Sequence, residues 1–504
     1  MLRKLPKSKG NRLYGGLLDM LSSNRLRAAQ RMNEDIVSGS GVFYFNALWR
    51  QTVVVSDPYL MAQLLHDNSL YKPARPDYIH FRQLMGPAGI ADLVTAQSDP
   101  GDWLWKTVRK GVAPAFAPQA LRTVYPKLAH VGGQLVDALK LLGDKEPVDM
   151  SLACMCETID ALGLTGFDKP YHNIACFKKG QPAHMLNVIR TANAEVARAM
   201  QNPLYKLWQQ LPGQPSKGQT AITQFHDMMI DLLQEVKAKG PPSEEDSSIA
   251  AQLMRLQDPQ TGQVLADKYL LPQISVLFWA GFDTTGNTMA WTLFCISQHP
   301  EVEKKMVAEL DAHGLLATSN NPHPRAPDYA DLTKLTYLSC VIKESMRMHT
   351  VVGFVTVRMS SRDLSLDDGK LVIPRNANIF LPVGLPHMSS AVYKDADQFL
   401  PERWLEPDAE YMPADPKGQH TSSEGTQGKV SRFMPFSDGR RQCVGMAFAK
   451  MNYTAILALL LGNFSFQLAE RMGGAEGVMA AQKYEVTLTP STGMWMHCCR
   501  RVKQ

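Results

Sequence analysis

The stretch RFMPFSDGRRQCVGMAFAK, residues 432–450, constrains this chain more than any other part of it. It holds a single cysteine, Cys443, in an arginine-rich turn between Gly439 and Gly445, and a long apolar run follows at once. The two glycines permit a tight backbone and the close approach of a flat partner. Because the apolar run predicts a helix, the sulfur is expected at a helix N-terminus, where free N–H groups and the helix dipole favour a thiolate.

The charges around Cys443 indicate a soft metal that carries anionic substituents. Arg440 and Arg441 place positive charge directly beside the expected thiolate. Haem fits this description, because its iron accepts a thiolate ligand and its propionates pair with arginines. A reduced core cysteine in a glycine turn is the alternative interpretation.

The remaining cysteines show no pattern of their own. They have no CxxC spacing, so we expect neither a disulfide framework nor a zinc site. Cys154 and Cys156 form a CxC without a second ligand pair, and we interpret them as buried helix residues. The other five are Cys176, Cys295, Cys340, Cys498 and Cys499.

The turn matches a known signature at five positions, Phe436-x-x-Gly439-x-Arg441-x-Cys443-x-Gly445. This pattern resembles the haem-binding loop of the cytochrome P450 superfamily, and a chance match in a chain of this length is on the order of 10⁻⁴. The resemblance implies that Cys443 is the axial ligand of the haem iron. It also implies that Phe436, Arg441 and Gly445 contact the cofactor.

Two further motifs follow in the order of that family. KESMR contains Glu344 and Arg347, which lie one helical turn apart and so on one face. FLPERW contains Arg403. These three residues resemble the Glu–Arg–Arg cluster of the family, in which a carboxylate shared by two guanidiniums can be buried. The resemblance implies a structural role that fastens the haem loop to its helix.

Other candidate cofactor contacts lie earlier and later in the chain. WLWKTVRKGVAPAF carries Trp105 and Arg109 four residues apart, so both could reach one haem propionate from one helix face. A surface Trp/Arg pair is the alternative. Arg358 lies in an extended segment after the KESMR helix, where the family usually places another propionate ligand.

The segment WAGFDTTGNTM, residues 279–289, places small and polar residues on an otherwise apolar helix. Ala280-Gly281-x-Asp283-Thr284 resembles the oxygen-activation motif of the family, which puts Ala280 beside the cofactor. We interpret Gly281 as letting the helix deform to open a groove, with Thr284 bonding oxygen-derived species and Asp283 relaying protons. The alternative is a helix whose hydroxyls only bond back to the i−4 carbonyl.

The pattern along the chain predicts a mainly α fold with a minor β part (α+β). GVFYFNALWRQTVVVSDP (41–58) predicts a hairpin, residues from 59 to about 350 are largely of helical period, and KLVIPRNANIFLPV (370–383) predicts short strands. Two polar segments, 317–329 and 406–430, predict loops.

The resemblance implies one large P450-like catalytic domain over residues 31–504, with haem between the oxygen-side helix and the Cys443 loop. Three features depart from the usual family pattern. Thr350 stands where a proline is usual, Ser437-Asp438 replace a glycine-rich filling, and the loop at 406–430 is long. None of them touches a required ligand, so they concern the subfamily rather than the activity.

Residues 1–30 are basic and hold no apolar run long enough to span a bilayer. They could form an amphipathic surface-binding segment, part of a transit peptide, the start of a chain whose anchor is missing, or a solvated tail. The resemblance implies a membrane-associated protein at the cytosolic face of the endoplasmic reticulum. A plastid or soluble location is the alternative.

The implied function is that of a haem-thiolate monooxygenase that uses haem b and O2 to insert one oxygen atom into an apolar small molecule. Electrons from NADPH would arrive indirectly, through a flavoprotein reductase or a ferredoxin, and the protein would act as a monomer. A lyase or isomerase that rearranges hydroperoxides is the alternative within the fold, although it needs no Asp283–Thr284 pair. A haem-binding carrier or sensor without turnover is the alternative outside it.

Charge and apolar pattern indicate the partners. Hydrophobic residues make up 45% and charged residues 20% of the 504-residue chain, and a net charge of +5 without a dense basic block argues against nucleic-acid binding. A basic patch at the expected docking face would steer an acidic electron donor, unless these are scattered solvated side chains. The patch would comprise Lys106, Lys110, Arg440 and Lys450. The substrate pocket is expected from segments 75–100, 165–215 and 351–357, the last with an apolar VVGFVTV sequence.

Overall fold

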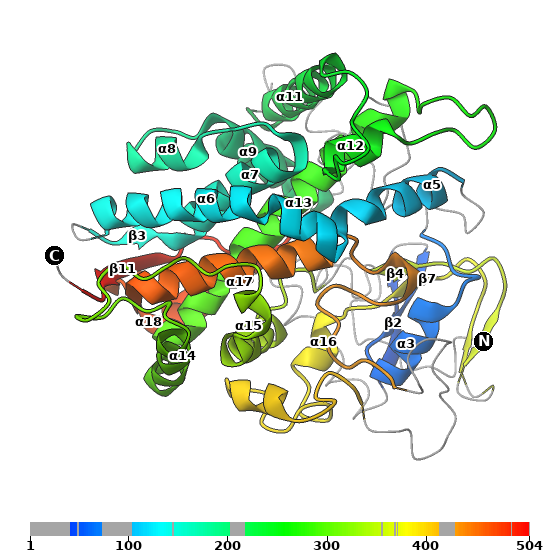
Figure 1. Cartoon of the computed structure of the whole chain (residues 1–504). Helices are drawn as coiled ribbons and strands as arrows, with labels where there is room; N and C mark the ends of the chain where they lie inside the picture. The colour runs from blue at the N-terminus through cyan, green and yellow to red at the C-terminus, as the bar shows by residue number, and fades with distance from the viewer. Residues whose placement is uncertain are drawn as a thin grey trace.

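Figure 1 shows a computed structural model of the chain, in which most of the length is helical. The structure describes residues 41–47, 50–72, 103–143, 146–201, 217–353, 356–366, 369, 371–412, 429–484 and 486–502. The basic segment 1–30, the expected pocket segment 75–100 and parts of the segments 165–215, 351–357 and 406–430 therefore lie outside the described residues.

The helices make up most of the described structure (Figure 1). They are α3 (Pro58–His66), α5 (Trp103–Val112), α6 (Pro118–Leu142), α7 (Met150–Phe167), α8 (Asn173–Lys178), α9 (His184–Gln201), α11 (Lys217–Ala238), α12 (Ile249–Met254), α13 (Asp267–Ser297), α14 (Pro300–Ala312), α15 (Thr336–Met348), α16 (Gly384–His387), α17 (Met446–Asn463) and α18 (Gly474–Ala481). Among them, no helix combines the length and apolar character that crossing a bilayer requires.

The strands of the described residues form small sheets. The largest has the order β1 (Val42–Ala47), β2 (Arg50–Val55), β7 (Asn378–Phe380) and β4 (Val357–Arg358). β1 and β2 are antiparallel, β2 and β7 are parallel, and β7 and β4 are antiparallel. The other sheets are β3 (Val148–Asp149) with β11 (Trp495–Arg500) and β8 (Phe464–Leu468), β5 (Leu364–Leu366) with β6 (Leu371–Ile373), and β9 (Gln482–Tyr484) with β10 (Leu488–Pro490).

The expected mainly α fold with a minor β part is confirmed, and the described residues form a single domain. The hairpin expected at 41–58 is β1 and β2, with Val42 opposite Val55. The short strands expected at 370–383 are β6 and β7. Cys154 and Cys156 lie buried on α7, as interpreted.

The core is built around three helices that are buried on nearly every side, α7, α13 and α17. α13 passes through the middle of the helical part, and it packs against α7, α15 and α17 (Figure 1). An added Cβ at Gly286 of α13 would lie 3.2 Å from the Met155 backbone of α7. The small residues of α13 therefore allow these two helices to approach closely.

Local sequence fixes where helices begin. The Asp57 carboxylate accepts a hydrogen bond from the Leu60 N–H at 2.9 Å, and Pro58 occupies the first position of α3. Asp149 caps α7 in the same way, because its side chain accepts from the Ser151 N–H at 3.1 Å. These caps satisfy donors that the helices leave open at their N-termini.

One buried acid of the core has no role in the sequence motifs. Glu157 on α7 is fully buried, and among the described residues no group forms a hydrogen bond with its carboxylate oxygens. The same holds for the amide of Asn452 on α17, a buried neighbour of Glu157. Burial, aided by the charge of Asp160, raises the pKa of Glu157 well above its usual range, although Asn452 opposes this. Burial therefore favours the protonated form of Glu157 in the folded protein.

A Glu157→Gln variant should be more stable than the parent chain at pH 8. The pKa of Glu157 is higher in the folded state, so the parent's free energy of unfolding falls as the pH rises above the ordinary glutamate pKa of about 4.3, by at most about 1.4 kcal/mol per pH unit. The variant lacks this loss. Urea unfolding followed by circular dichroism at pH 5 and pH 8 measures it, with exposed Glu476→Gln as the control. An equal midpoint difference at both pH values would contradict a neutral Glu157.

Candidate functional site

The Cys443 turn has a backbone that only a glycine at position 439 allows. The short 3₁₀ turn η5 (Gly439–Arg441) begins at Gly439 with a φ of 69°, and the Cys443 N–H donates to the Phe436 carbonyl at 3.0 Å. An added Cβ at Gly439 would lie 2.3 Å from the Leu65 carbonyl oxygen of α3. The turn is therefore pressed against the end of α3.

Asp438, one of the departures from the family pattern, ties the same turn to α3. Its Oδ1 accepts the Gly439 N–H at 2.7 Å, and its Oδ2 lies 3.3 Å from His66 Nε2. The hydrogen bond from His66 to Asp438 raises the pKa of His66. Its neighbour Ser437 adopts a φ of 60°, a conformation that serine adopts less readily than glycine. The unusual Ser-Asp pair thus replaces flexible glycines with a capped, charge-paired turn.

The thiol of Cys443 sits just before α17, whose N-cap is Gly445. Desolvation by the surrounding protein raises the pKa of the thiol, and this is the largest of the effects on it. The N–H groups of Gly445 and Met446 and the charge of Arg109 on α5 lower it. The groups that favour a thiolate are therefore in place, and a bound metal cation would supply the remaining stabilisation.

Trp105, Arg109 and Arg441 meet beside Cys443. The Arg441 guanidinium carbon lies 3.5 Å from the centroid of the Trp105 ring, and that of Arg440 lies 5.7 Å from it. These are stacking distances for a cation on an aromatic face. Arg440 also donates to the Leu70 carbonyl at 3.0 Å. The sequence motif indicated Trp105 and Arg109 of α5, but it did not predict that Trp105 stacks on Arg441 of the Cys443 turn.

A second group of cations gathers at the same place. Tyr71 and Met359 exchange backbone hydrogen bonds of 3.0 and 2.8 Å, which places Lys72 beside Arg358 of β4. Arg358 is 3% exposed. Burial lowers the pKa of Lys72 well below its usual range, and the charges of Arg358 and Arg441 lower it further. Lys72 was absent from the candidates, because its place depends on a bridge between segments far apart in the sequence.

These residues fit a haem. An accessible cysteine thiol at a helix N-terminus matches an axial ligand, and three crowded cations, Lys72, Arg358 and Arg441, match the negative charge of two propionates. An added Cβ at Gly445 would come no closer than 3.9 Å to Phe116, so the protein alone does not require glycine there. A flat group packed against the turn would explain why glycine occupies position 445.

The oxygen-side segment lies in the middle of α13, which is α-helical over its whole range. Gly281 is within the α-helical range of α13. An added Cβ at Gly281 would lie 2.8 Å from Leu162 of α7, so this glycine serves close packing between helices. The Thr284 hydroxyl donates to the Ala280 carbonyl at 2.9 Å, which is the arrangement of the alternative interpretation.

Asp283, the other candidate for proton transfer, is nearly buried at 7% exposure. Its Oδ1 accepts a hydrogen bond of 3.2 Å from the Asn287 amide, and its Oδ2 accepts a short one from the Thr487 hydroxyl. Thr487 lies in the turn between β9 and β10 and was not among the candidate residues. No sequence pattern indicates a contact between residues 204 positions apart.

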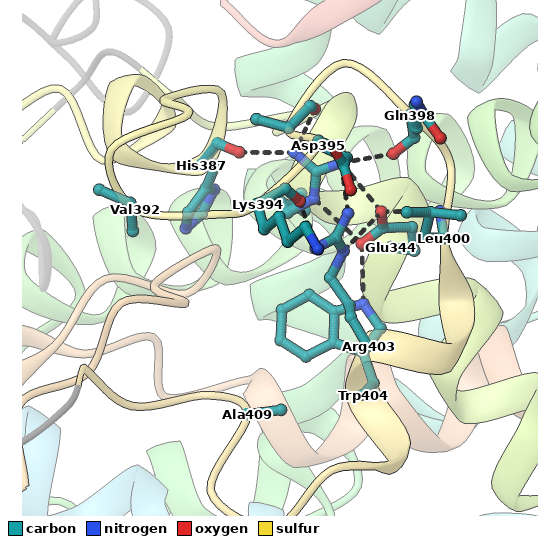
Figure 2. A network of polar contacts seen from close by, with 12 residues as sticks. Glu344, His387, Val392, Lys394, Asp395, Gln398, Leu400, Arg403, Trp404 and Ala409 are labelled. Atoms are coloured by element: carbon teal, nitrogen blue, oxygen red, sulfur yellow. Dashed lines mark hydrogen bonds and ion pairs between the residues drawn. The ribbon is translucent and has the colours of Figure 1, made fainter.

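Glu344, Arg347 and Arg403 form one cluster, in which Glu344 and Arg347 are fully buried. Figure 2 shows Glu344 and Arg403 from close by. Arg347 Nε and NH2 donate to the two Glu344 oxygens at 3.0 and 2.9 Å, and Arg403 Nε donates at 3.0 Å. The Leu400 N–H and the Trp404 indole donate to the same carboxylate at 3.0 and 2.9 Å. The carboxylate thus receives five hydrogen bonds, which compensates for its burial.

The guanidiniums of the cluster also hold backbone carbonyls of the segment that follows α16. Arg347 donates to the carbonyls of His387, Ala396 and Gln398 at 2.7, 2.8 and 3.0 Å. Arg403 donates to those of Lys394 and Asp395 at 2.9 and 3.1 Å (Figure 2). A carboxylate with its two arginines therefore organises the whole segment 387–404.

His387 connects that cluster to the Cys443 turn. Its Nε2 accepts the Met434 N–H at 2.9 Å, so the ring is neutral with the proton on Nδ1, which donates to the Thr350 hydroxyl at 2.8 Å. Burial, together with Arg347, lowers the pKa of His387 to about 3. Thr350 in turn donates to the Met346 carbonyl at 2.9 Å. A proline at position 350 could make neither side-chain bond, so this departure from the family pattern has a structural use.

The chain matches the family model described as Cytochrome P450 over residues 23–491. It is 23% identical to the bifunctional cytochrome P450/NADPH–P450 reductase ascE of Acremonium egyptiacum, over 93% of this chain and 41% of that protein. It is 26% identical to cytochrome P450 3A41 of Mus musculus, over 82% of this chain and 76% of the relative. It is 23% identical to the chloroplastic protein LUTEIN DEFICIENT 5 of Arabidopsis thaliana, over 85% and 68%.

The family model covers most of the chain, including the Cys443 turn, the Glu344 cluster and the oxygen-side segment of α13. The chain spans less than half of the reductase-fused relative, whose name includes a second activity. The chain belongs to the cytochrome P450 family of haem-thiolate monooxygenases, which use haem b and O2 with electrons that come from NADPH.

Proposed function

We propose that this chain inserts one oxygen atom of O2 into an apolar small molecule, with Cys443 as the axial ligand of haem iron. The observation that carries the proposal is the accessible Cys443 thiol at the start of α17, beside Arg109 and against the Trp105–Arg441 stack. When bound, haem supplies the activation of O2 and the transfer of one oxygen atom. The protein supplies the ligand, the charges and the proton path.

On the Cys443 side, the chain holds charge in place. The N–H groups before α17 and the charge of Arg109 stabilise the thiolate. Lys72, Arg358 and Arg441 would pair with the propionates, and Trp105 would fix the Arg441 plane by stacking. Phe436 supports the turn through its carbonyl.

On the α13 side, the proposed roles are proton transfer by Asp283 and hydrogen bonding by Thr284, with Ala280 facing the cofactor. The Thr284 hydroxyl is bonded to the Ala280 carbonyl, so it is positioned by its own helix and can turn toward a bound oxygen. Asp283 is nearly buried, and its carboxylate accepts hydrogen bonds from the Asn287 amide and the Thr487 hydroxyl. A proton that reaches this carboxylate is shielded from bulk water.

The electron donor is proposed to be a flavoprotein reductase or a ferredoxin that docks near the Cys443 turn. Lys106 and Lys110 are exposed on one face of α5, and Lys450 is exposed on α17. These three side chains could steer an acidic partner. Arg440, the fourth residue of the expected patch, is engaged with the Leu70 carbonyl and the Trp105 ring, so its proposed role is to hold the turn.

The substrate is proposed to be an apolar molecule such as a fatty acid, terpenoid or sterol. The segment 351–357 supports this, since Val351 and Val357 are apolar and buried. We further propose one catalytic domain over residues 31–504 that acts as a monomer. Peripheral membrane contact through residues 1–30, at the cytosolic face of the endoplasmic reticulum or in a plastid, completes the proposal.

The first test is the reduced, carbon-monoxide-bound difference spectrum of the purified chain. The parent should show the red-shifted band of thiolate ligation, and Cys443→Ser should lose it, because a serine hydroxyl does not replace the thiolate donor. Cys176→Ser, which changes another accessible cysteine, should keep the band. A red-shifted band that survives in Cys443→Ser would place the ligand elsewhere.

Replacement of Glu344 by alanine should leave little soluble protein with haem. The change leaves two guanidiniums in a buried site without their carboxylate, which typically costs about 3–5 kcal/mol. Trp404→Phe removes a single hydrogen bond to the same carboxylate, so it should cost about 1–2 kcal/mol and keep the cofactor. Haem content per protein and the midpoint of urea unfolding measure both effects.

The neighbouring Glu402→Ala is the matched control for Glu344→Ala. Glu402 pairs with Lys305 at the surface, where an ion pair contributes little. A normal yield of haem protein from Glu344→Ala would contradict the organising role of the cluster.

Replacement of Lys106 and Lys110 by glutamate should slow reduction by a reductase at low salt, on the order of ten-fold, because two charges of an attractive patch change sign. The rate for the parent should fall as the salt concentration rises, and that dependence should weaken in the variant. Stopped-flow reduction between 20 and 500 mM salt measures this. Lys304→Glu on α14 is the control. Equal salt dependence in parent and variant would show that the donor docks elsewhere.

A further inference from the structure

The Asp283 carboxylate accepts hydrogen bonds from two uncharged side chains, one on the next turn of α13 and one between β9 and β10. The Thr487 hydroxyl donates to Oδ2, and the Asn287 amide donates to Oδ1 at 3.2 Å. The same amide lies 3.3 Å from the Thr487 hydroxyl oxygen, so the three side chains close a triangle. All three are at most 7% exposed. A carboxylate with two donors from different directions has a fixed orientation.

The turn that carries Thr487 is itself fixed. The Leu488 N–H donates to the Val351 carbonyl at 2.9 Å, and the Leu488 carbonyl accepts from the Trp291 indole of α13 at 3.0 Å. The Tyr484 hydroxyl donates to the Thr350 carbonyl at 2.5 Å. Bonds on both sides of Thr487 therefore hold its hydroxyl in place relative to α13. The turn does not need Asp283 to keep its position.

The Asn287 amide presents its N–H groups, and not its oxygen, to Asp283. Asn287 is fully buried, and its Oδ1 has no hydrogen-bond partner in the described residues. Turning the amide over would satisfy neither group, because it would place an oxygen against the carboxylate. An amide that keeps its N–H groups toward Asp283 gives up a bond of its own, at a cost of about 1–3 kcal/mol for a buried acceptor. The arrangement keeps both Asp283 oxygens as hydrogen-bond acceptors.

We propose that Thr487 is a positioning residue for proton delivery: with Asn287 it aims the Asp283 carboxylate beside Thr284. This inference rests on the proposed function. The coupled reaction is RH + O2 + NADPH + H⁺ → ROH + H2O + NADP⁺, in which the O–O bond breaks. If proton delivery were misdirected or slow, O2 + NADPH + H⁺ → H2O2 + NADP⁺ would compete, and the O–O bond would survive. Aim of the carboxylate therefore decides the ratio of the two products.

The test compares three variants of the full-length haem protein with its parent. Thr487→Val removes the hydroxyl at nearly constant volume, Thr487→Ser keeps the hydroxyl, and Asp283→Asn removes the carboxylate. The probe is the compound, among a fatty acid, a terpene and a sterol, that shifts the Soret band of the parent most. The readouts are H2O2 released per NADPH oxidised and the solvent deuterium isotope effect on NADPH oxidation.

Thr487→Val should raise the peroxide yield per NADPH several-fold and increase the solvent isotope effect, in the direction of Asp283→Asn. Thr487→Ser should stay within about two-fold of the parent, because the hydrogen bond is restored. A parent-like Thr487→Val would overturn the proposal. A Thr487→Ser variant as uncoupled as Thr487→Val would also overturn it, since only the methyl group would then matter.

A second measurement does not depend on turnover. Thermal melting of Thr487→Val, Asp283→Asn and the double variant forms a double-mutant cycle, and the double variant should lose less than the sum of the two single Tm losses. Additive losses would overturn the contact itself. A parent without the thiolate band or without NADPH oxidation would overturn the proposed function instead, and the melting cycle would still report on the Asp283 cluster.

Discussion

The burial of one carboxylate, Glu344, is the constraint on which the Cys443 side of the molecule depends. An ion without its hydration shell is tolerable only if its oxygens find donors, and Glu344 receives five hydrogen bonds (Figure 2). The two arginines that pair with it use their remaining N–H groups on backbone carbonyls between residues 387 and 398. A segment with little regular structure thereby obtains a fixed path.

Hydrogen bonds from the segment 387–398 also hold the residues that lead into the Cys443 turn. His387 accepts the Met434 N–H, and the Tyr393 hydroxyl donates to the Arg432 carbonyl at 3.1 Å, so both ends of residues 432–434 are held. The neutral state of His387 matters here, because a protonated ring would lose the acceptor that the Met434 N–H needs. Its low pKa, about 3, keeps the link intact across the physiological range. The Glu344–Arg347 ion pair is therefore connected through His387 to the turn that carries Cys443.

Sequence alone predicted the parts of this structure that depend on short-range spacing. Glu344 and Arg347 could be paired because three residues separate them on a helix, and the hairpin at 41–58 followed from its β-branched runs. Trp404, Lys72 and Thr487 could not be found, because their roles depend on contacts across tens to hundreds of residues. The close approach of Gly281 to Leu162 could not be predicted either, since Leu162 belongs to another helix.

The two faces of the site are built from different physical interactions, and this has a consequence for their tolerance of change. The Cys443 face relies on ions whose removal leaves a partner charged and buried, so single substitutions there are expensive. The α13 face relies on neutral hydroxyls and an amide around Asp283, where each hydrogen bond contributes about 1 kcal/mol. The side of the Cys443 turn is therefore less tolerant of substitution than the α13 side, and Thr487 is the point on the α13 side where a residue far away in the sequence acts on Asp283.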